Sequence, residues 1–365
     1  MQLESELKEL VFGEFAHGAN IYAVSKLYSL PNKTLVDLSS STNPLVSEWL
    51  KQRKKLVEEL LENVYQYPDP EATELKKAIS KKLGVCEENI LPSSGSVELM
   101  YFVLWSLRPK RVVIFEPSFV EYLRACNTVE AEVERVFILN QDSQIDAIKT
   151  VLKKRKADLV FLCNPNNPTG SYLKKEEVLS VVKEFEEVFF VIDEAFVEFI
   201  EEESVVKEAV FRKNLLVLRS LTKFYGLAGL RIGFGIGEKG VIKRIKQIMP
   251  PWRINTLAEK IAKVLILDEE FYQRTKSYFL KEKNRFEEAL KRLKVKFFPS
   301  VTNFYLLYFK NRGKKLWEDF LKRGILLRSC FNFFGLGWDY IRVSLKQTEE
   351  NERFLKELEK WLKAV

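Results

Sequence analysis

A lysine in a glycine-rich turn is the residue of this sequence best placed for covalent chemistry. Lys223 lies in the stretch SLTKFYGLAGLRIG (220–233), with Ser220 three residues before it and Arg231 eight residues after it. Its other neighbours are apolar, and a second cation nearby lowers the pKa of an amine toward that of a nucleophile. Most lysines at the edge of a sheet are instead solvated surface charges. The residues alone are compatible with both interpretations.

An aspartate at the end of an apolar run is the second candidate. Asp193 follows VFFVI in the stretch VFFVIDEAF (188–196). A buried strand that runs directly into Asp-Glu favours a carboxylate held in the interior over an exposed aspartate in a turn. Acidic and basic candidates therefore both follow expected strands.

Short apolar runs must position these groups. The expected strands are 111–117, 158–165, 188–196, 215–222 and 231–237. Between several of them lie helical patterns such as LKKEEVLSVVKEFEE, which predicts a mainly parallel α/β sheet flanked by helices. In such sheets ligand sites collect at the carboxyl ends of the strands, where Lys223 and Asp193 are expected.

After about residue 265 the sequence pattern changes to a long charged helix and fewer strands, which predicts a smaller α+β domain. The chain begins to change at PPWRIN (250–255). We expect an N-terminal segment over 1–40 that packs as a lid on the small domain, a large domain over 41–265 and the small C-terminal domain over 266–365.

Composition excludes several classes of function. Of 365 residues, 46% are apolar and 30% charged, which suits a globular protein with ample core. The start MQLESELKEL is no signal peptide, and no apolar run approaches the ~18 residues of a membrane span, so we expect a cytoplasmic protein. Four scattered cysteines and one histidine predict no metal site. The net charge is +8, but the basic residues are interleaved with glutamate along the chain. We therefore expect no continuous basic surface for nucleic acid.

One glycine motif is set aside. GIGEKG (235–240) fits the G-x-G-x-x-G pattern of dinucleotide-binding turns. Its helix soon meets Pro250-Pro251, and no strand with an acidic end follows it. A strand that ends in a glycine turn is the better interpretation.

Five segments in order resemble one known family. SLTKFYGLAGLRIG is similar to the cofactor-lysine segment of the fold-type-I pyridoxal-phosphate enzymes, the aspartate-aminotransferase superfamily. NPNNPTG (164–170) resembles that family's N-P-x-G turn, and VIDEAF (191–196) its aspartate strand. PSSGSVELM (92–100) resembles the phosphate-binding turn, and YIRVSL (340–345) the C-terminal arginine strand. The resemblance implies the aspartate-aminotransferase-like fold, with pyridoxal 5'-phosphate bound by the large domain.

The resemblance also assigns roles around the cofactor ring. Lys223 would hold the cofactor covalently and later carry a proton, and Asp193 would pair with the pyridine nitrogen. Asn167 would bond the 3-hydroxyl, and Phe119 in EPSFVEY would stack on the ring. Phe196 of DEAF stands where most aminotransferases carry a tyrosine.

The cofactor's phosphate would bind at a helix N-terminus. The implied contacts are Gly95, Ser96, Val97, Ser220 and Arg231. In this superfamily the sites lie at a dimer interface, and Tyr67 in YQYPDP matches the tyrosine that reaches the partner's cofactor phosphate. The resemblance therefore implies a homodimer with shared active sites.

Candidate substrate contacts lie near both ends of the chain. Arg342 matches the family's arginine for the substrate carboxylate, and Arg328 in ILLRSC is a second fork-shaped donor. Two such groups suit a small amino compound with two anionic groups, although one of them can serve as a salt bridge. His17, the single histidine, is a lid residue that would donate to the substrate, or else a surface histidine. STNPL (41–45) is similar to the I-N-P-L element of the family's threonine-phosphate decarboxylases, which implies Asn43 as a further candidate.

Two sub-families fit: threonine-phosphate decarboxylases and histidinol-phosphate aminotransferases. HGANIY (17–22) resembles the H-G-G-N segment of the decarboxylases, with Ala19 in place of the second glycine. DEAF and the C-terminal stretch 324–362 also resemble them. The favoured hypothesis is decarboxylation of L-threonine O-3-phosphate to (R)-1-aminopropan-2-yl phosphate in cobalamin biosynthesis. The alternatives are histidinol-phosphate aminotransferase and, from another class, a non-catalytic regulator or nucleic-acid binder.

Overall fold

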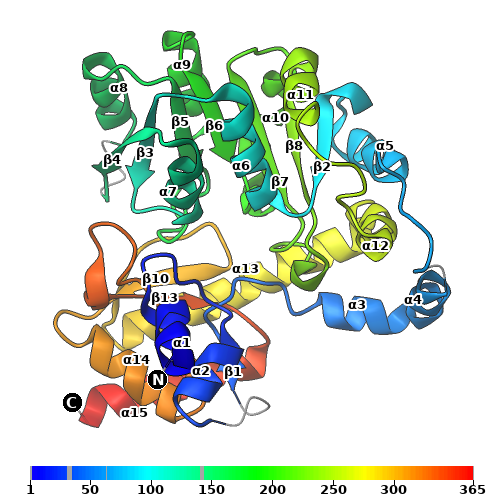
Figure 1. The fold of residues 1–365 in the computed structure, drawn as a ribbon. Helices are drawn as coiled ribbons and strands as arrows, with labels where there is room; N and C mark the ends of the chain where they lie inside the picture. Colours follow the sequence, from blue (N-terminus) through cyan, green and yellow to red (C-terminus); the bar gives the residue numbers. More distant parts are fainter. Residues whose placement is uncertain (1, 31–34, 63, 140–143, 365) are drawn as a thin grey trace.

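The computed structural model describes residues 2–30, 35–62, 64–139 and 144–364 of the chain. Its two parts lie one above the other in Figure 1 and are bridged by the long helix α13 (Glu269–Arg292). We call the part built on a seven-stranded sheet the large part, and the part built on a four-stranded sheet the small part.

The sheet of the large part is mixed but mostly parallel. In spatial order its strands are β2 (Ile90–Ser93), β8 (Gly233–Gly237), β7 (Leu215–Ser220), β6 (Phe189–Asp193), β5 (Leu159–Cys163), β3 (Arg111–Glu116) and β4 (Glu132–Phe137). Neighbours from β7 to β4 pair parallel, whereas β8 is antiparallel to both β7 and β2. All five predicted strands are confirmed, and β2 and β4 extend the sheet at its two edges.

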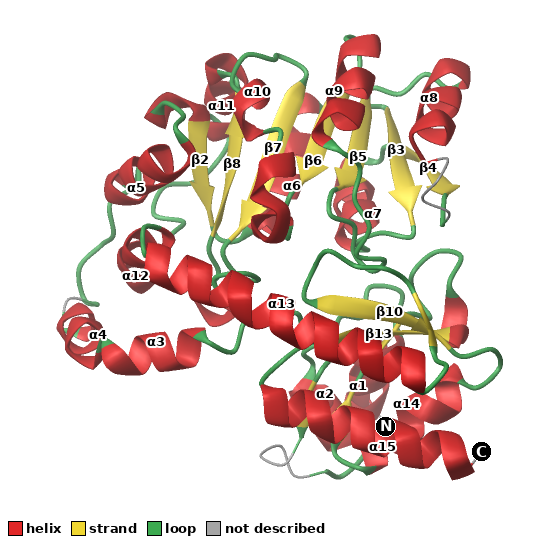
Figure 2. Ribbon diagram, turned by 180° about the vertical axis from the view of Figure 1, so that it is seen from behind, coloured by secondary structure: helices red, strands yellow, loops and turns green. Residues whose placement is uncertain are grey.

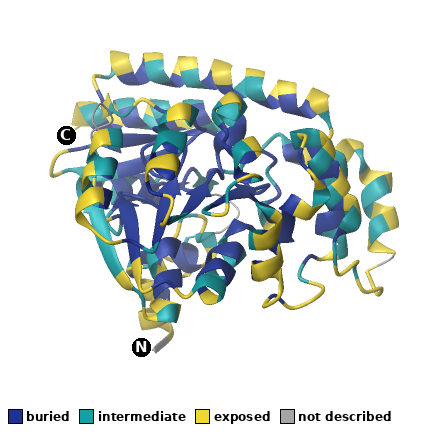
Figure 3. Cartoon of the chain, turned by 90° about the horizontal axis from the view of Figure 1, so that it is seen from above, coloured by how far each residue is buried: buried dark blue, intermediate teal, exposed yellow. Residues whose placement is uncertain are grey.

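Helices cover both faces of this sheet, which explains its continuous apolar runs. One face packs against α6 (Ser96–Leu107), α7 (Glu121–Cys126) and α11 (Lys239–Lys246). The other packs against α5 (Thr73–Leu83), α8 (Gln144–Lys154), α9 (Lys175–Glu184), α10 (Val206–Ala209) and α12 (Thr256–Ile266). Successive residues of a strand point to opposite faces, so Val191 joins one core and Ile192 the other. Figure 3 shows the resulting buried interior with exposed outer helix faces.

The small part is built on antiparallel strands. Their order is β12 (Arg328–Ser329), β13 (Tyr340–Ser344), β10 (Phe304–Tyr308) and β9 (Lys296–Phe297). Beside them β1 (Val36–Asp37) pairs parallel with β11 (Ile325–Leu326). Helices α14 (Gly313–Lys322) and α15 (Thr348–Ala364) complete this part (Figure 2).

Both ends of the chain contribute to the core of the small part. The N-terminal helices α1 (Gln2–Phe12) and α2 (Ile21–Leu27) bury Leu7, Val11 and Val24 in the same cluster as α14 and α15. Helix α13 joins the two cores, because Phe271 packs in the large one and Phe286 in the small one. Helices α3 (Val46–Gln52) and α4 (Lys54–Leu61) lie to one side (Figure 1).

The glycine run 235–240 ends β8 and begins α11, with Glu238 as the N-cap. Since both neighbours of β8 are antiparallel to it, this run does not open a βαβ unit. Across the described ranges, every helix is too short or too polar to cross a bilayer.

Candidate active site

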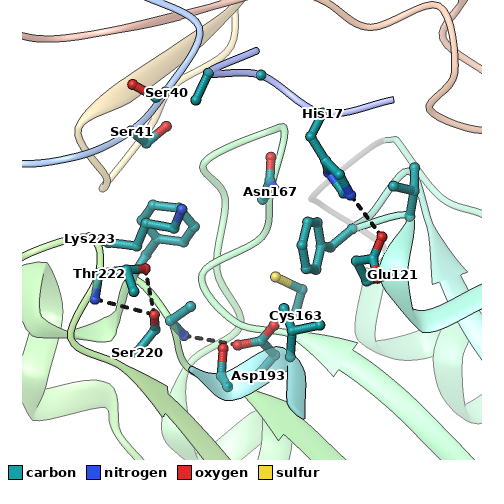
Figure 4. Close-up of a pocket in the computed structure, with 18 of the residues that line it drawn as sticks. His17, Ser40, Ser41, Glu121, Cys163, Asn167, Asp193, Ser220, Thr222 and Lys223 are labelled. Atoms are coloured by element: carbon teal, nitrogen blue, oxygen red, sulfur yellow. Dashed lines mark hydrogen bonds and ion pairs between the residues drawn. The ribbon is translucent and has the colours of Figure 1, made fainter. Parts of the chain in front are cut away.

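A cavity of about 380 Å³ opens at the carboxyl ends of β5, β6 and β7, where the two parts meet. Figure 4 shows that its walls come from the turns after these strands and from segments of the small part and the N-terminus. The predicted residues that line it are His17, Ser96, Val97, Phe119, Asn167, Asp193, Phe196, Ser220, Lys223, Arg231, Arg328 and Arg342. The fold therefore brings together residues that lie more than 300 positions apart.

Lys223 lies in the turn that follows β7. Its carbonyl oxygen accepts hydrogen bonds from the N–H groups of Asn43 and Gly226, both at 3.1 Å, which hold the turn in place. Burial, followed by the charges of Arg342 and Arg231, lowers the pKa of its amine to about 8. Lys223 thus loses its proton more readily than an ordinary lysine, which favours its neutral, nucleophilic form.

Asp193 ends β6 and is buried. It accepts hydrogen bonds from the hydroxyl of Tyr122 at 2.7 Å and from the N–H of Ala195 at 3.1 Å. Burial raises the pKa of this carboxyl, while those two hydrogen bonds and the charge of Lys223 act against the rise. Tyr122 is itself held in a stack on Phe161, with ring centroids 4.9 Å apart. The carboxylate therefore has a fixed orientation toward the cavity.

An anion site lies at the N-terminus of α6. Its N-cap, Gly95, has φ +86, and a Cβ atom on it would lie 2.8 Å from Nη2 of Arg231. Glycine therefore keeps the space between the helix end and the guanidinium open. The hydroxyls of Ser220 and Thr222, 2.7 Å apart, also border the cavity. Free N–H groups, hydroxyls and a guanidinium together suit a phosphate.

Two buried arginines enter the cavity from the small part. Arg328 on β12 and Arg342 on β13 are register partners in the sheet. Burial lowers the pKa of each guanidinium to about 10. Across the described ranges, neither has a carboxylate within ion-pair distance.

The hydrogen bonds of these arginines go to neutral oxygens. Arg328 donates to the carbonyls of Ser329 and Ala16 at 2.6 and 2.8 Å, and to Oδ1 of Asn332 at 2.8 Å. Arg342 donates to the carbonyl of Ser39 at 2.7 Å and to Oδ1 of Asn167. Its Nε is buried without a partner among the described residues. Both cations thus keep capacity for an anionic ligand.

A family model for aminotransferase class I and II matches residues 33–358. The chain belongs to this family. The histidinol-phosphate aminotransferase of Methanocaldococcus jannaschii is 31% identical over 372 residues, with 98% of each chain covered. The threonine-phosphate decarboxylase of Salmonella typhimurium is 31% identical over 357 residues, covering 96% of this chain and 97% of the relative. The crystal structure of the histidinol-phosphate aminotransferase from Clostridium acetobutylicum has a TM-score of 0.82 at 30% identity, covering 91% of this chain and 100% of that one.

The fold is accordingly aspartate-aminotransferase-like, and the cofactor of this family is pyridoxal 5'-phosphate. The cavity fits that group. The low-pKa amine of Lys223 could hold it covalently, and buried Asp193 could pair with its ring nitrogen. The open space beside Gly95 and Arg231 could hold its phosphate. The protein is a pyridoxal-phosphate-dependent enzyme, either a decarboxylase or an aminotransferase.

Three predicted residues do not line the cavity. Gly95 lies immediately behind its wall, against Arg231. Asn43 is buried, and its side-chain amide donates hydrogen bonds to the carbonyl of Phe224 at 2.8 Å and to the hydroxyl of Thr275 at 3.1 Å. Tyr67 is 83% exposed. Its predicted role concerns a second copy of the chain.

The structure adds residues that the sequence analysis did not name as site residues. These are Ser39, Ser40, Ser41, Glu121, Arg124, Cys163, Thr222 and Phe333 on the cavity wall, and Tyr122 behind Asp193. Tyr122 stands three residues after Phe119 in a stretch already singled out. The serines precede Asn43 in the chain, so the motif STNPL located this segment, although the side chain of Asn43 does not line the cavity.

Proposed function

We propose that this enzyme removes CO2 from L-threonine O-3-phosphate and releases (R)-1-aminopropan-2-yl phosphate, a step of cobalamin biosynthesis. The observation that carries the proposal is the pair Arg328 and Arg342, two adjacent buried cations without carboxylate partners among the described residues. A substrate with both a carboxylate and a phosphate would supply one anion for each. Histidinol phosphate carries a phosphate but no carboxylate.

Each remaining residue has a task in this proposal. Ser96, Ser220 and Arg231 anchor the cofactor's phosphate, with Gly95 and Val97 shaping the helix end. Phe119 and Phe196 would lie beside its ring, Asn167 would bond its 3-hydroxyl, and Asp193 would keep its nitrogen protonated. When bound, the cofactor supplies the π system that accepts the electrons left at Cα.

The arginines decide which bond of the substrate breaks. They would hold the carboxylate and the phosphate, and so would set the direction of the bond from Cα to the carboxylate. As CO2 leaves, one proton is taken up at Cα, and the amine of Lys223 would deliver it. The pKa of about 8 suits a group that must both accept and return a proton near neutral pH.

A homodimer with shared active sites is part of the proposal. Tyr67 and Trp252 form an exposed aromatic pair, with ring centroids 5.0 Å apart, on the surface of the large part. Exposed aromatic pairs of this kind are typical of surfaces that a partner covers. Tyr67 would then contact the partner's cofactor phosphate.

The second candidate is histidinol-phosphate aminotransferase, which transfers the amino group to 2-oxoglutarate in histidine biosynthesis. Relatives with that name are the more numerous at about 30% identity. One observation weighs against it: Glu121, a carboxylate that could receive a substrate's imidazole, is already bonded to the imidazole of His17 at 2.7 Å.

Product analysis decides between the two. The purified enzyme, loaded with cofactor, is incubated with phosphothreonine alone and with histidinol phosphate plus 2-oxoglutarate. We expect CO2 and aminopropanol phosphate from the first mixture and little glutamate from the second. Glutamate from the second mixture without CO2 from the first would overturn the proposal. Lys223→Ala is the control and should lose both the visible absorbance of the attached cofactor and all turnover.

A further inference from the structure

A buried carboxylate lies in a cavity whose proposed substrate is anionic. Glu121 and Asp193 are the acidic residues that line the cavity within the described ranges. The side chain of Glu121 is only 6% exposed. An uncompensated carboxylate at this place would repel a phosphate or a second carboxylate, because charges interact strongly away from bulk water. Its charge has to be answered by a positive group before such a substrate can bind.

Two neighbours can supply that group: Arg124, which forms an ion pair with Glu121, and His17 when its imidazole is protonated. Nε2 of His17 lies 2.7 Å from Oε1 of Glu121, while the hydroxyl of Tyr101 donates to Oε2 at 3.1 Å and Arg124 lies at 3.4 Å. Burial acts to raise the pKa of Glu121, but the hydrogen bond and charge of His17, with Arg124 and Tyr101, outweigh it and lower the pKa. Glu121 is therefore ionised at neutral pH. Because Nε2 is occupied, the other ring nitrogen of His17 is left for a ligand.

The two residues come from opposite walls of the cavity. The backbone around His17 is tied to the small part, since the carbonyl of Ala16 accepts from Arg328 at 2.8 Å and the N–H of Ala19 donates to Ser39 at 2.7 Å. Glu121 is the first residue of α7 in the large part. Figure 4 shows the pair at one side of the cavity, with Asn167 between it and Lys223. This contact thus connects the N-terminal segment to the large part.

The ring of His17 is also oriented by an aromatic neighbour. Its centroid lies 5.6 Å from that of Phe119, which precedes Glu121 by two residues. The ring is partly exposed, with 41% of its side-chain surface accessible, and it lines the cavity. One ring nitrogen is therefore fixed by Glu121 while the remaining edge can meet a ligand.

We propose that Glu121 is a positioning residue, which holds His17 with its second ring N–H available to the anionic group of the substrate and leaves no acceptor for a substrate imidazole. This inference rests on the proposed function for the nature of the substrate. A carboxylate that orients a histidine through one ring nitrogen is a general device for setting the direction of the other. Here it also determines specificity, because the enzyme's own imidazole takes the place that a substrate imidazole would need.

The single histidine makes a direct test possible. Tag-free holoenzyme labelled with ¹⁵N-histidine gives ring signals from His17 alone. Inorganic phosphate is the probe, and we expect it to shift these signals saturably. In Glu121→Gln the affinity read from the shift should fall about 10-fold, because a charge-assisted hydrogen bond is lost. Tyr101→Phe, which removes the longer bond to the same carboxylate, should change it less than about 3-fold.

Kinetics separate positioning from a merely structural role. For phosphothreonine, Glu121→Gln should raise KM about 10-fold and leave kcat and the cofactor's absorbance nearly unchanged. His17→Ala should have the same effect, and the double variant should be no worse than either single one. Glu184→Gln, in an exposed pair with Lys149 and Lys153, is the surface control. Glu121→Asp, which keeps the charge, should recover part of the loss.

Two results would overturn the inference. One is that the ring signals of His17 do not shift when phosphate is added. The other is that the effects of His17→Ala and Glu121→Gln on KM are additive in the double variant. Failure of the inference is distinguishable from that of the proposed function. If the enzyme uses histidinol phosphate and not phosphothreonine, the proposed function and the specificity role fail together. The phosphate response of His17 in Glu121→Gln still decides whether Glu121 positions it.

Discussion

Buried arginines have opposite surroundings in the two parts of the molecule. In the large part Arg219, on β7 beside Ser220, is surrounded by acidic side chains. Its guanidinium contacts Glu194 at 3.0 Å, Glu198 at 3.3 Å and Glu201 at 2.6 Å. In the small part Arg328 and Arg342 bond only neutral oxygens among the described residues.

The difference separates structure from ligand binding. Burial acts to lower the pKa of Arg219, but the carboxylates raise it well above its usual value. Such a cation has no capacity left for a substrate. Instead it connects Glu194, next to Asp193, with the strand that leads to Lys223, and so holds the ends of β6 and β7. Burial lowers the pKa values of the cations of the small part, and a bound anion would oppose that effect by stabilising their charged forms.

The largest expected effect comes from removing Arg219, the buried arginine that is paired with acidic side chains. Arg219→Met leaves buried carboxylates without their cation, and we expect a loss of about 3–5 kcal/mol of unfolding free energy. Denaturation followed by tryptophan fluorescence measures it. Arg155→Met, in an exposed pair with Glu134, is the control and should cost less than about 1 kcal/mol. Equal stability of Arg219→Met and wild type would break the comparison.

Removing an arginine of the small part should instead lower activity and leave stability nearly unchanged. Arg342→Met should lower kcat/KM about 100-fold, since a charged hydrogen-bond donor to the substrate is lost, while unfolding free energy changes by less than about 1 kcal/mol. Arg328→Met should behave in the same way. Substrate titration and thermal denaturation of the holoenzymes provide the two measurements. A variant that unfolds but keeps the KM of wild type would show that the residue is structural.

The smallest expected effect is a pH dependence of stability, which comes from an acidic residue beside Arg219. Burial, with the charge of Glu201, raises the pKa of Glu198 from 4.5 to about 8, although Arg219 acts to lower it. The folded protein therefore binds this proton more tightly than the unfolded chain, so the associated stability is complete below about 4.5 and lost as pH rises through about 8. Glu198→Gln cannot titrate, so its Tm should exceed that of wild type by a few degrees at pH 9 and by less at pH 5. Parallel Tm curves for the two proteins would contradict this.

Local pattern was sufficient for the strands and for the residues that end them. Each predicted strand of the large sheet is a short apolar run, and Asp193, Ser220 and Lys223 lie at or just after the ends of two adjacent ones. Parallel strands place their carboxyl ends at one edge, so position along the chain already implied proximity in space. The two strands at the sheet edges, β2 and β4, were missed because Ile90–Ser93 is short and Glu132–Phe137 alternates with charged residues.

The local sequence pattern did not predict which side chains of distant segments contact one another. Asn43 was assigned to the substrate from its turn, yet in the structure its amide bonds Phe224 and Thr275, and the neighbouring serines face the cavity. Tyr122 supports Asp193 across 71 positions. Neither orientation follows from spacing along one element.

By itself the sequence determined the strand pattern and the order of the motifs, because these depend on neighbours within a few residues, and it singled out Lys223 as a candidate. The burial and the distant charge of Arg342 that lower the pKa of this amine come from the fold. The tertiary structure alone decided which buried charges have a partner of opposite charge. Arg219 meets three carboxylates, Arg328 and Arg342 meet none among the described residues, and His17 meets Glu121 104 positions away. Charge compensation depends on distance in space and on exclusion of water, and both arise only when the two parts of the chain close around one cavity.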